Sequence, residues 1–177
     1  MNGPQLLLLY NTMFLPHLHY CLLNWGNFKG DGNSGLRGGL VSLQKSLVRI
    51  ITASTNPISH ADPLFARLAI LKIDDLFSQR VRMFSYKLSR GLLPSGVSSI
   101  FDKVKHVHRT RGASSNLYVG RSDARSIRSI APKCWNSLPS CLKESPSIGS
   151  FRDSSKRGLL APCSSFACNV VGCRSCM

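Results

Sequence analysis

Apolar residues recur at helical spacing through most of the first 100 positions. Residues 5–25 are almost continuously apolar and predict a buried helix with a kink or break at Pro16. A second, amphipathic helix is predicted from Leu36. Its apolar face comprises Leu36, Leu40, Leu43, Leu47 and Ile50, and its other positions include Arg37, Gln44, Lys45 and Arg49. Between the two helices, the six glycines of residues 26–39 predict a loop.

Capping signals predict two further helices between residues 62 and 91. Asp62 followed by Pro63 predicts a short helix, since Asp accepts from free backbone amides and Pro fits the first helical position. Asp74 predicts the start of a longer helix, which ends at Gly91. The longer helix has an apolar face of Leu76, Phe77, Val81, Phe84 and Leu88, and an outer face of Arg80, Arg82, Lys87 and Arg90. These cations are either a solvated face or contacts for phosphate, and the pattern leaves both open.

Beyond Pro94 the helical periodicity fades. Residues 117–119 and 126–130 predict short strands, and residues 148–159 predict a last short helix. The predicted fold class is therefore mainly α: a small helical bundle followed by a basic, loop-rich segment with at most a short β-hairpin.

Charge changes this picture by suggesting a partner. The chain has 177 residues, with 23 Lys and Arg against 8 Asp and Glu, and a net charge of +15. Residues 101–177 alone hold +9 of that charge. The hydrophobic fraction of 43% argues against a wholly disordered chain, so we expect a core, and the basic excess points to a polyanionic partner.

Residues 6–25 are long enough to cross a bilayer, but polar side chains interrupt them. Asn11, Pro16 and His17 would each need a partner in lipid, which favours a buried helix over a membrane helix. The first residues carry neither a positive charge nor a small-residue cleavage site, so no secretory signal is predicted. We expect an intracellular protein, nuclear or cytoplasmic, that is neither secreted nor bound to a membrane.

Candidate catalytic groups are few. Asp74 and Asp75 could hold metal ions for nucleotidyl transfer, but helix capping accounts for them more simply. His17 and His19 point to different helical faces and cannot share a metal. The basic segment 106–112, with its two histidines, suits phosphate contact better than metal binding.

Cysteines concentrate at the C-terminal end. A C-x4-C-x4-C-x2-C pattern is formed by Cys163, Cys168, Cys173 and Cys176. Thiolates this close could surround one tetrahedral zinc ion, but a disordered tail with free thiols explains them equally well. Cys21, on the first apolar helix, is most simply a core residue.

The sequence Trp135-Asn136-Ser137-Leu138-Pro139 is compact and unusual. We interpret Trp135 and Leu138 as anchors that dock on the helices, while Pro139 turns the chain away. Trp135 could alternatively stack with a nucleic-acid base, but we favour the packing role.

An ordered series of short motifs resembles the region that follows the polymerase core in reverse transcriptases of LINE-type, jockey-like non-LTR retrotransposons. The resemblance covers roughly residues 5–160. Its motifs are Leu9-Tyr10-Asn11, Leu15-Pro16-His17-Leu18-His19-Tyr20-Cys21, Trp25-Gly26, Leu43-Gln44-Lys45, Arg49-Ile50-Ile51-Thr52, His60-Ala61-Asp62-Pro63-Leu64-Phe65, Leu68-Ala69-Ile70-Leu71-Lys72, Asp75-Leu76, Leu93-Pro94, Thr110-Arg111, Ser126-Ile127-Arg128, Pro132-Lys133-Cys134-Trp135-Asn136-Ser137-Leu138-Pro139 and Ser150-Phe151-Arg152.

The resemblance implies a helical, thumb-like region at residues 1–100, a basic extension at 101–162 and a Cys-rich tail at 163–177. It implies contact with the RNA template and the primer–template duplex, and with a palm region located upstream in a full-length polymerase. The family's aromatic-x-Asp-Asp signature has no counterpart here, because Lys72-Ile73-Asp74-Asp75 lacks the aromatic residue and falls in the later region. This chain alone is therefore not expected to be an enzyme.

The leading hypothesis is a truncated polymerase fragment that binds RNA or an RNA–DNA duplex and needs no cofactor other than zinc in the tail. The alternative is an inactive remnant, a marginally stable helical module without a binding function. The candidate phosphate contacts are Arg80, Arg82, Lys87, Arg90, Lys103, Lys105, Arg109 and Arg111.

Overall fold

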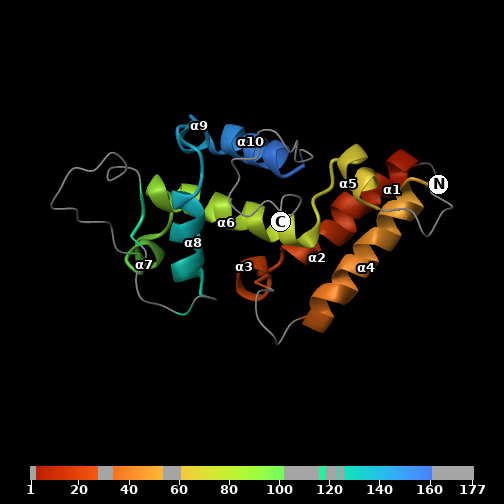
Figure 1. Cartoon of the computed structure of the whole chain (residues 1–177), viewed down its shortest axis with the longest axis horizontal. Coiled ribbons are helices and arrows are strands. Elements are labelled where there is room, and N and C mark those ends of the chain that lie inside the picture. Colours follow the sequence, from red (N-terminus) through yellow and green to blue (C-terminus); the bar gives the residue numbers. More distant parts are fainter. Residues whose placement is uncertain are drawn as a thin grey trace. The chain divides into compact units, whose positions relative to one another are not determined.

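The computed structural model describes residues 3–27, 34–53, 61–101, 116–118, 123 and 126–160, and they are mainly helical (Figure 1). The predicted mainly α fold class is thus confirmed. The chain divides into two compact units, residues 1–81 and residues 82–177, which we call the N-terminal and the C-terminal unit. The domain boundaries that we placed at residues 100 and 162 concern charge and motif content, and they stay predictions.

The division between the units falls inside one helix, α6 (Ile73–Ser89). The N-terminal unit also contains α1 (Gly3–Leu9), the π-helical η1 (Tyr10–Phe14), α2 (Leu15–His19), α3 (Leu22–Trp25), α4 (Ser34–Ile51) and α5 (Asp62–Arg67). The C-terminal unit also contains α7 (Ser95–Ser98), α8 (Ile127–Asn136), α9 (Ser140–Lys143) and α10 (Ile148–Leu160).

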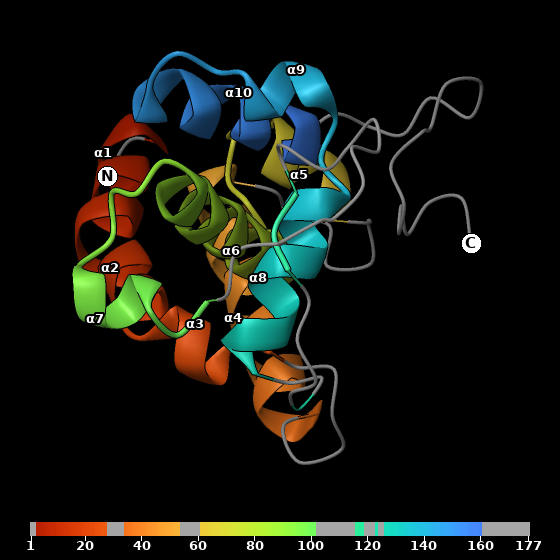
Figure 2. The same cartoon turned by 90° about the vertical axis from the view of Figure 1, so that its left-hand side faces the viewer.

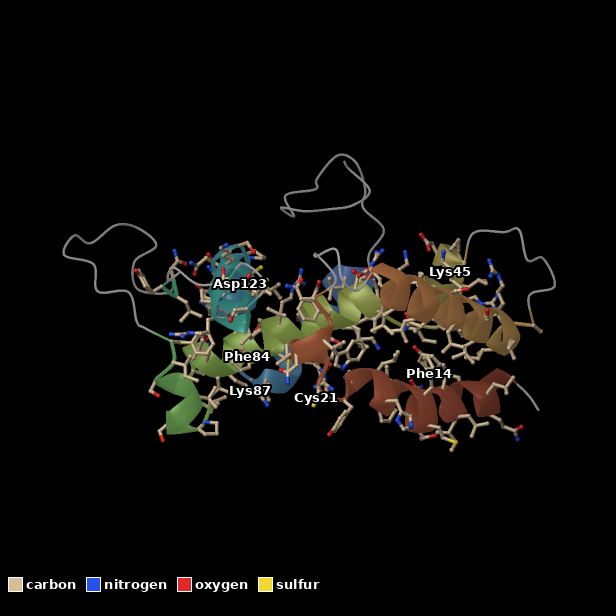
Figure 3. The ribbon with its side chains drawn as sticks, turned by 90° about the horizontal axis from the view of Figure 1, so that it is seen from below. Phe14, Cys21, Lys45, Phe84, Lys87 and Asp123 are labelled. Atoms are coloured by element: carbon tan, nitrogen blue, oxygen red, sulfur yellow. The ribbon has the colours of Figure 1, made fainter. Side chains whose placement is uncertain are left out.

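The predicted irregularity at Pro16 takes the form of a π-helical segment just before it. Proline lacks a backbone N–H, and the helical ladder widens here, so that the N–H of Leu15 donates to the carbonyl of Tyr10, five residues back. The helical path is interrupted only after α2, at Cys21, whose backbone is left-handed with a φ of 49°. The expectation that Cys21 is a core residue is wrong, because this turn leaves it exposed (Figure 3).

The core of the N-terminal unit lies where α1 and α4 run side by side (Figure 1). Figure 3 shows Phe14 between these two helical segments, and its ring centroid lies 5.3 Å from that of Tyr10. The buried members are Tyr10, Val48, Ile51, Ala61, Phe65 and Ile70, with Leu6, Leu7, Phe14, Leu15, Leu47, Leu64 and Leu68 packed against them. The first apolar segment is therefore a packed helical element of this unit. Within the described residues, no helix is both long enough and apolar enough to cross a membrane.

The predicted faces of α4 need correction. Leu36, Leu43 and Ile50, assigned to the apolar face, are 53%, 46% and 60% exposed. The buried positions are instead Gln44 and Val48, at 1% and 0%, together with Ile51. This face is buried because Gln44 forms hydrogen bonds with polar groups of Tyr10, Leu71 and Ile73, which a leucine side chain could not form. The helix begins at Ser34, so Gly35, Gly38 and Gly39, which the predicted loop included, are helical.

Gln44 connects the elements around it through hydrogen bonds. Its Oε1 accepts from the N–H of Ile73 at 2.9 Å, and its Nε2 donates to the hydroxyl of Tyr10 at 3.1 Å and to the carbonyl of Leu71 at 3.3 Å. Burial raises the pKa of Tyr10, and its bond with Gln44 opposes that rise in part. The entry to α6 is thus attached to α4 and η1 by one amide.

The acidic residues at the starts of α5 and α6 have partners other than those expected of caps. Asp74 receives two hydrogen bonds from Arg37, at 2.9 and 2.6 Å, and this pairing raises the pKa of Arg37. Asp62 pairs with Lys72 at 2.9 Å, and Ala61 occupies the cap position of α5. Both helices start close to the predicted positions, and the acidic residues of their first turns, Asp62 and Asp74, each form an ion pair.

The C-terminal unit has an aromatic core in which α8 and α10 pack against α6 (Figure 2). The Tyr86 and Phe151 rings stack with centroids 4.6 Å apart, and the Trp135 ring lies 6.5 Å from each. Trp135 is 3% exposed and Leu138 is 7% exposed, which confirms the prediction that they act as packing anchors. The buried ring of Trp135 does not offer a face for a base.

The prediction of little regular structure beyond Pro94 is wrong for residues 127–143, which form α8 and α9, whereas the last short helix predicted at residues 148–159 is confirmed as α10. Residues 126–130, expected to be a strand, instead start α8, where the Ser126 hydroxyl accepts from the N–H of Arg128 at 3.3 Å. Leu117, on the other expected strand, pairs with a side chain: its N–H and carbonyl each bond the amide of Asn136 at 2.9 Å.

Candidate nucleic-acid interface

The candidate phosphate contacts on α6 fall into different surroundings. Arg80 belongs to the N-terminal unit, and Arg82, Lys87 and Arg90 belong to the C-terminal unit. Three of these cations bond groups within their own unit, and the fourth, Lys87, is exposed and has no such partner among the described residues.

Arg80 is bonded to a histidine of the N-terminal unit. Its Nε donates to Nδ1 of His19 at 2.6 Å. Burial, and then the charge of Arg80, lower the pKa of His19 to about 4. Because His19 is neutral near pH 7 and its Nδ1 accepts a bond, its Nε2 carries the ring proton. Burial also lowers the pKa of Arg80.

Arg82 is half-buried, and its guanidinium donates to the hydroxyl of Ser155 at 3.4 Å. The same guanidinium lies close enough to Cys134 to affect its thiol. Burial raises the pKa of Cys134, while the charge and the hydrogen bond of Arg82 oppose the rise. Arg82 therefore serves the packing of α6 against α8 and α10.

Arg90 is exposed, but its guanidinium already forms hydrogen bonds within the C-terminal unit. It donates to the carbonyls of Lys143 and Ser145, each at 3.3 Å, and its charge lies 5.5 Å from the centre of the Tyr86 ring. Such bonds and the cation–π contact stabilise the turn before α10. A phosphate would have to compete with these contacts.

Lys87 is the α6 cation that best fits a surface contact. Its side chain is exposed on the C-terminal half of the helix (Figure 3). A flexible ammonium in this position can approach a phosphate without disturbing packing.

The remaining sequence candidates lie outside the described residues. They are Lys103, Lys105, Arg109 and Arg111, and the tail cysteines Cys163, Cys168, Cys173 and Cys176. In the part of the chain that the structure describes, no group of three or more His, Cys, Asp or Glu residues could hold a metal ion.

Other exposed cations were not among the sequence candidates. Lys133 is exposed on α8, and Arg152 and Arg157 are exposed on α10, where Arg152 pairs with its neighbour Asp153 at 3.0 Å. Helical spacing would have found the α10 pair, because Phe151 and Ser155, four residues apart, mark the buried side, and Arg152 and Arg157 fall on the other side of the helix.

The carboxylate pair Asp74 and Asp75 gives no support for metal-dependent chemistry. Arg37 makes a two-point contact with Asp74, so its charge is already neutralised. A second cation at the same carboxylate would have to displace the guanidinium.

Comparison with known proteins adds no assignment: no family model, no curated protein sequence and no solved structure matches this chain.

Proposed function

We propose that this chain is the nucleic-acid-holding part of a LINE-type reverse transcriptase, lacking the catalytic palm, and that it binds RNA or an RNA–DNA duplex without doing chemistry itself. In this proposal it acts inside the cell, in the nucleus or the cytoplasm. The resemblance of its motif series supplies the family, and the surface charge of the C-terminal unit supplies the physical support.

That charge is the observation that carries the proposal. The described residues of the C-terminal unit include nine Lys and Arg against three Asp and Glu. The cations are Arg82, Lys87, Arg90, Arg128, Lys133, Lys143, Arg152, Lys156 and Arg157. Lys87, Lys133 and Arg157 are exposed on helices with an ordered aromatic core beneath them, so their charges are held on a stable scaffold. Phosphate contacts of this kind supply affinity without reading sequence.

The test is fluorescence anisotropy of a labelled RNA–DNA duplex with the full chain and single charge-removing variants. Lys87→Gln, Lys133→Gln and Arg157→Gln are each expected to weaken binding and to reduce the salt slope by about one. Lys45→Gln is the matched control, because it removes the same charge from α4 of the N-terminal unit (Figure 3). Equal effects of all four variants would reject a surface on the C-terminal unit.

The zinc hypothesis for the tail remains a prediction. Protein purified without chelator is expected to contain zinc that Cys173→Ser loses. Wild-type protein free of metal would reject it, and the duplex-binding proposal does not depend on it.

A second candidate, an inactive and marginally stable module, is favoured by a different observation. Leu36, Leu43 and Ile50 form an exposed apolar stripe on α4. Exposed stripes of this kind accompany missing partners and aggregation. Strong binding of a hydrophobic dye, combined with no affinity for any nucleic acid, would support this second candidate over the first.

A further inference from the structure

The N-terminal unit contains a shallow, open pocket of about 400 Å³. That volume lies within the range of small-ligand clefts, ~300–1,000 Å³. Its lining combines an apolar floor with polar and aromatic groups: Asn11, Leu15, Pro16, His19, Tyr20 and Arg80. All six residues belong to residues 1–81.

Arg80 and His19 give the pocket a donor group suited to an anion. The Nε of Arg80 is held by His19, which fixes the plane of the guanidinium. Its terminal Nη groups have no acceptor among the described residues and can donate to two oxygens of one phosphate. The Nε2–H of neutral His19 is a further donor beside them.

Tyr20 supplies an aromatic face at the same site. It is 76% exposed, on the turn between α2 and α3. The turn is held in place because Nε1 of Trp25 donates to the Tyr20 carbonyl at 2.7 Å. An exposed ring on an ordered turn can stack with a base at little conformational cost.

Asn11 and the apolar floor complete the chemistry. The exposed amide of Asn11 offers both a donor and an acceptor, which can pair with the polar edge of a base. Leu15 and Pro16 provide apolar contact for a sugar or a ring.

We propose that this pocket binds one unpaired nucleotide, with its phosphate on Arg80 and its base against Tyr20. The inference rests on the proposed nucleic-acid function and names the part of the substrate that the N-terminal unit takes. The nucleotide can come from a single-stranded extension of a duplex or from a free mononucleotide, and the two sources are separable by experiment.

The strand source is tested by comparing a blunt RNA–DNA duplex with the same duplex carrying a short unpaired oligoadenylate tail. The tail is expected to raise the affinity of wild-type protein about tenfold, the effect of one stacked base. Tyr20→Ala is expected to abolish that gain and leave the affinity for the blunt duplex unchanged, since it removes no charge. Tyr118→Ala, which removes another exposed tyrosine, is the control and is expected to keep the gain.

The free source is tested by titrating 5′-AMP into the full chain and following the NMR signals of the His19 and Tyr20 rings. Saturable shifts that Arg80→Gln eliminates would support the pocket even if no duplex binds, which separates its failure from that of the proposed function. The inference is overturned if the unpaired tail adds no affinity and 5′-AMP moves neither ring. It is equally overturned if Tyr20→Ala behaves like wild type in both measurements.

Discussion

One buried amide connects three segments of the N-terminal unit. Gln44 is 1% exposed, and its hydrogen bonds reach η1 and the start of α6. Buried polar groups of this kind cost little when every bond is made and much when one partner is removed.

Gln44→Met keeps the volume of the side chain but leaves the buried N–H of Ile73 without its acceptor. We expect the free energy of unfolding to fall by about 1–3 kcal/mol. Urea denaturation measures this change. Lys45→Met, at the next position of α4, is the control and is expected to stay within about 0.5 kcal/mol of wild type. Similar stabilities of the two variants would show that the Gln44 bonds contribute nothing.

His19 makes stability depend on pH. Its pKa is lowered to about 4 in the folded chain from an ordinary 6.5, so between these values the unfolded chain binds a proton that the folded chain does not. The contribution to stability is fully present above pH 6.5 and is lost as the pH falls toward 4. Because His19 is only half-buried, we expect a loss of about 1 kcal/mol.

Thermal unfolding between pH 7 and pH 4.5 measures this effect in wild type and two variants. His19→Gln keeps an acceptor for Arg80 and is expected to show a smaller drop in stability on acidification. His17→Gln, at an exposed position, is the control and is expected to follow wild type. A drop in His19→Gln as large as in wild type would place the pH dependence elsewhere.

Sequence reasoning failed at Gln44 for a physical reason. The run from Leu36 to Ile50 gives leucine and isoleucine the spacing of a helix face, and a binary pattern assigns every glutamine to the solvent side. No local signal records that Tyr10, Leu71 and Ile73, distant in sequence, present polar groups to that position. Tertiary partners decided which side of α4 became buried.

At the scale of elements, local end signals worked best. The C-terminal end of α6 lies where Gly91 predicts it: Gly91 has a φ of 67°, and the N–H of Leu92 donates to the carbonyl of Lys87 at 2.8 Å. By contrast, α8 contains Pro132 in its interior. A proline normally argues against a helix, which is why its helical spacing was missed.

The packing of α10 depends on Phe151, which is fully buried against Tyr86 and Trp135. Phe151→Ala is expected to lower the free energy of unfolding of the C-terminal unit by about 3–5 kcal/mol, since it leaves a cavity in the aromatic core. Near-ultraviolet circular dichroism during urea unfolding reports the loss. Ile148→Ala, on the same helix at a position 37% exposed, is the control and is expected to cost far less. A minor effect of Phe151→Ala would mean that α10 is not held by this core.

The cations of the C-terminal unit differ in what they contact. Arg82 and Arg90 bond groups of other helices or turns of their own unit and act in packing. Lys87 and Lys133 are exposed, and exposed Arg157 bonds only the hydroxyl of Ser154 on its own helix among the described residues. The sequence predicted the basic face of α6 but not which of its cations act in packing. That depends on which carbonyl and hydroxyl groups the folded chain places near each cation.

At the scale of the whole molecule, the net charge of +15 is the feature that the proposed function must explain. The mainly α class was predictable, since helical periodicity covers the first 100 residues. The interface was predictable only in part, because half of the sequence candidates lie outside the described residues and Arg82 and Arg90 act in packing. What remains is a set of exposed cations on the C-terminal unit, which suits the proposed contact with phosphates.

The most direct test of that claim is the salt dependence of the affinity of the full chain for an RNA–DNA duplex, measured by anisotropy from 50 to 300 mM salt. If several exposed cations contact phosphates, the logarithm of the association constant falls linearly with the logarithm of salt concentration, with a slope of about −3 or steeper. A flat dependence, or no binding at the lowest salt, would contradict the account.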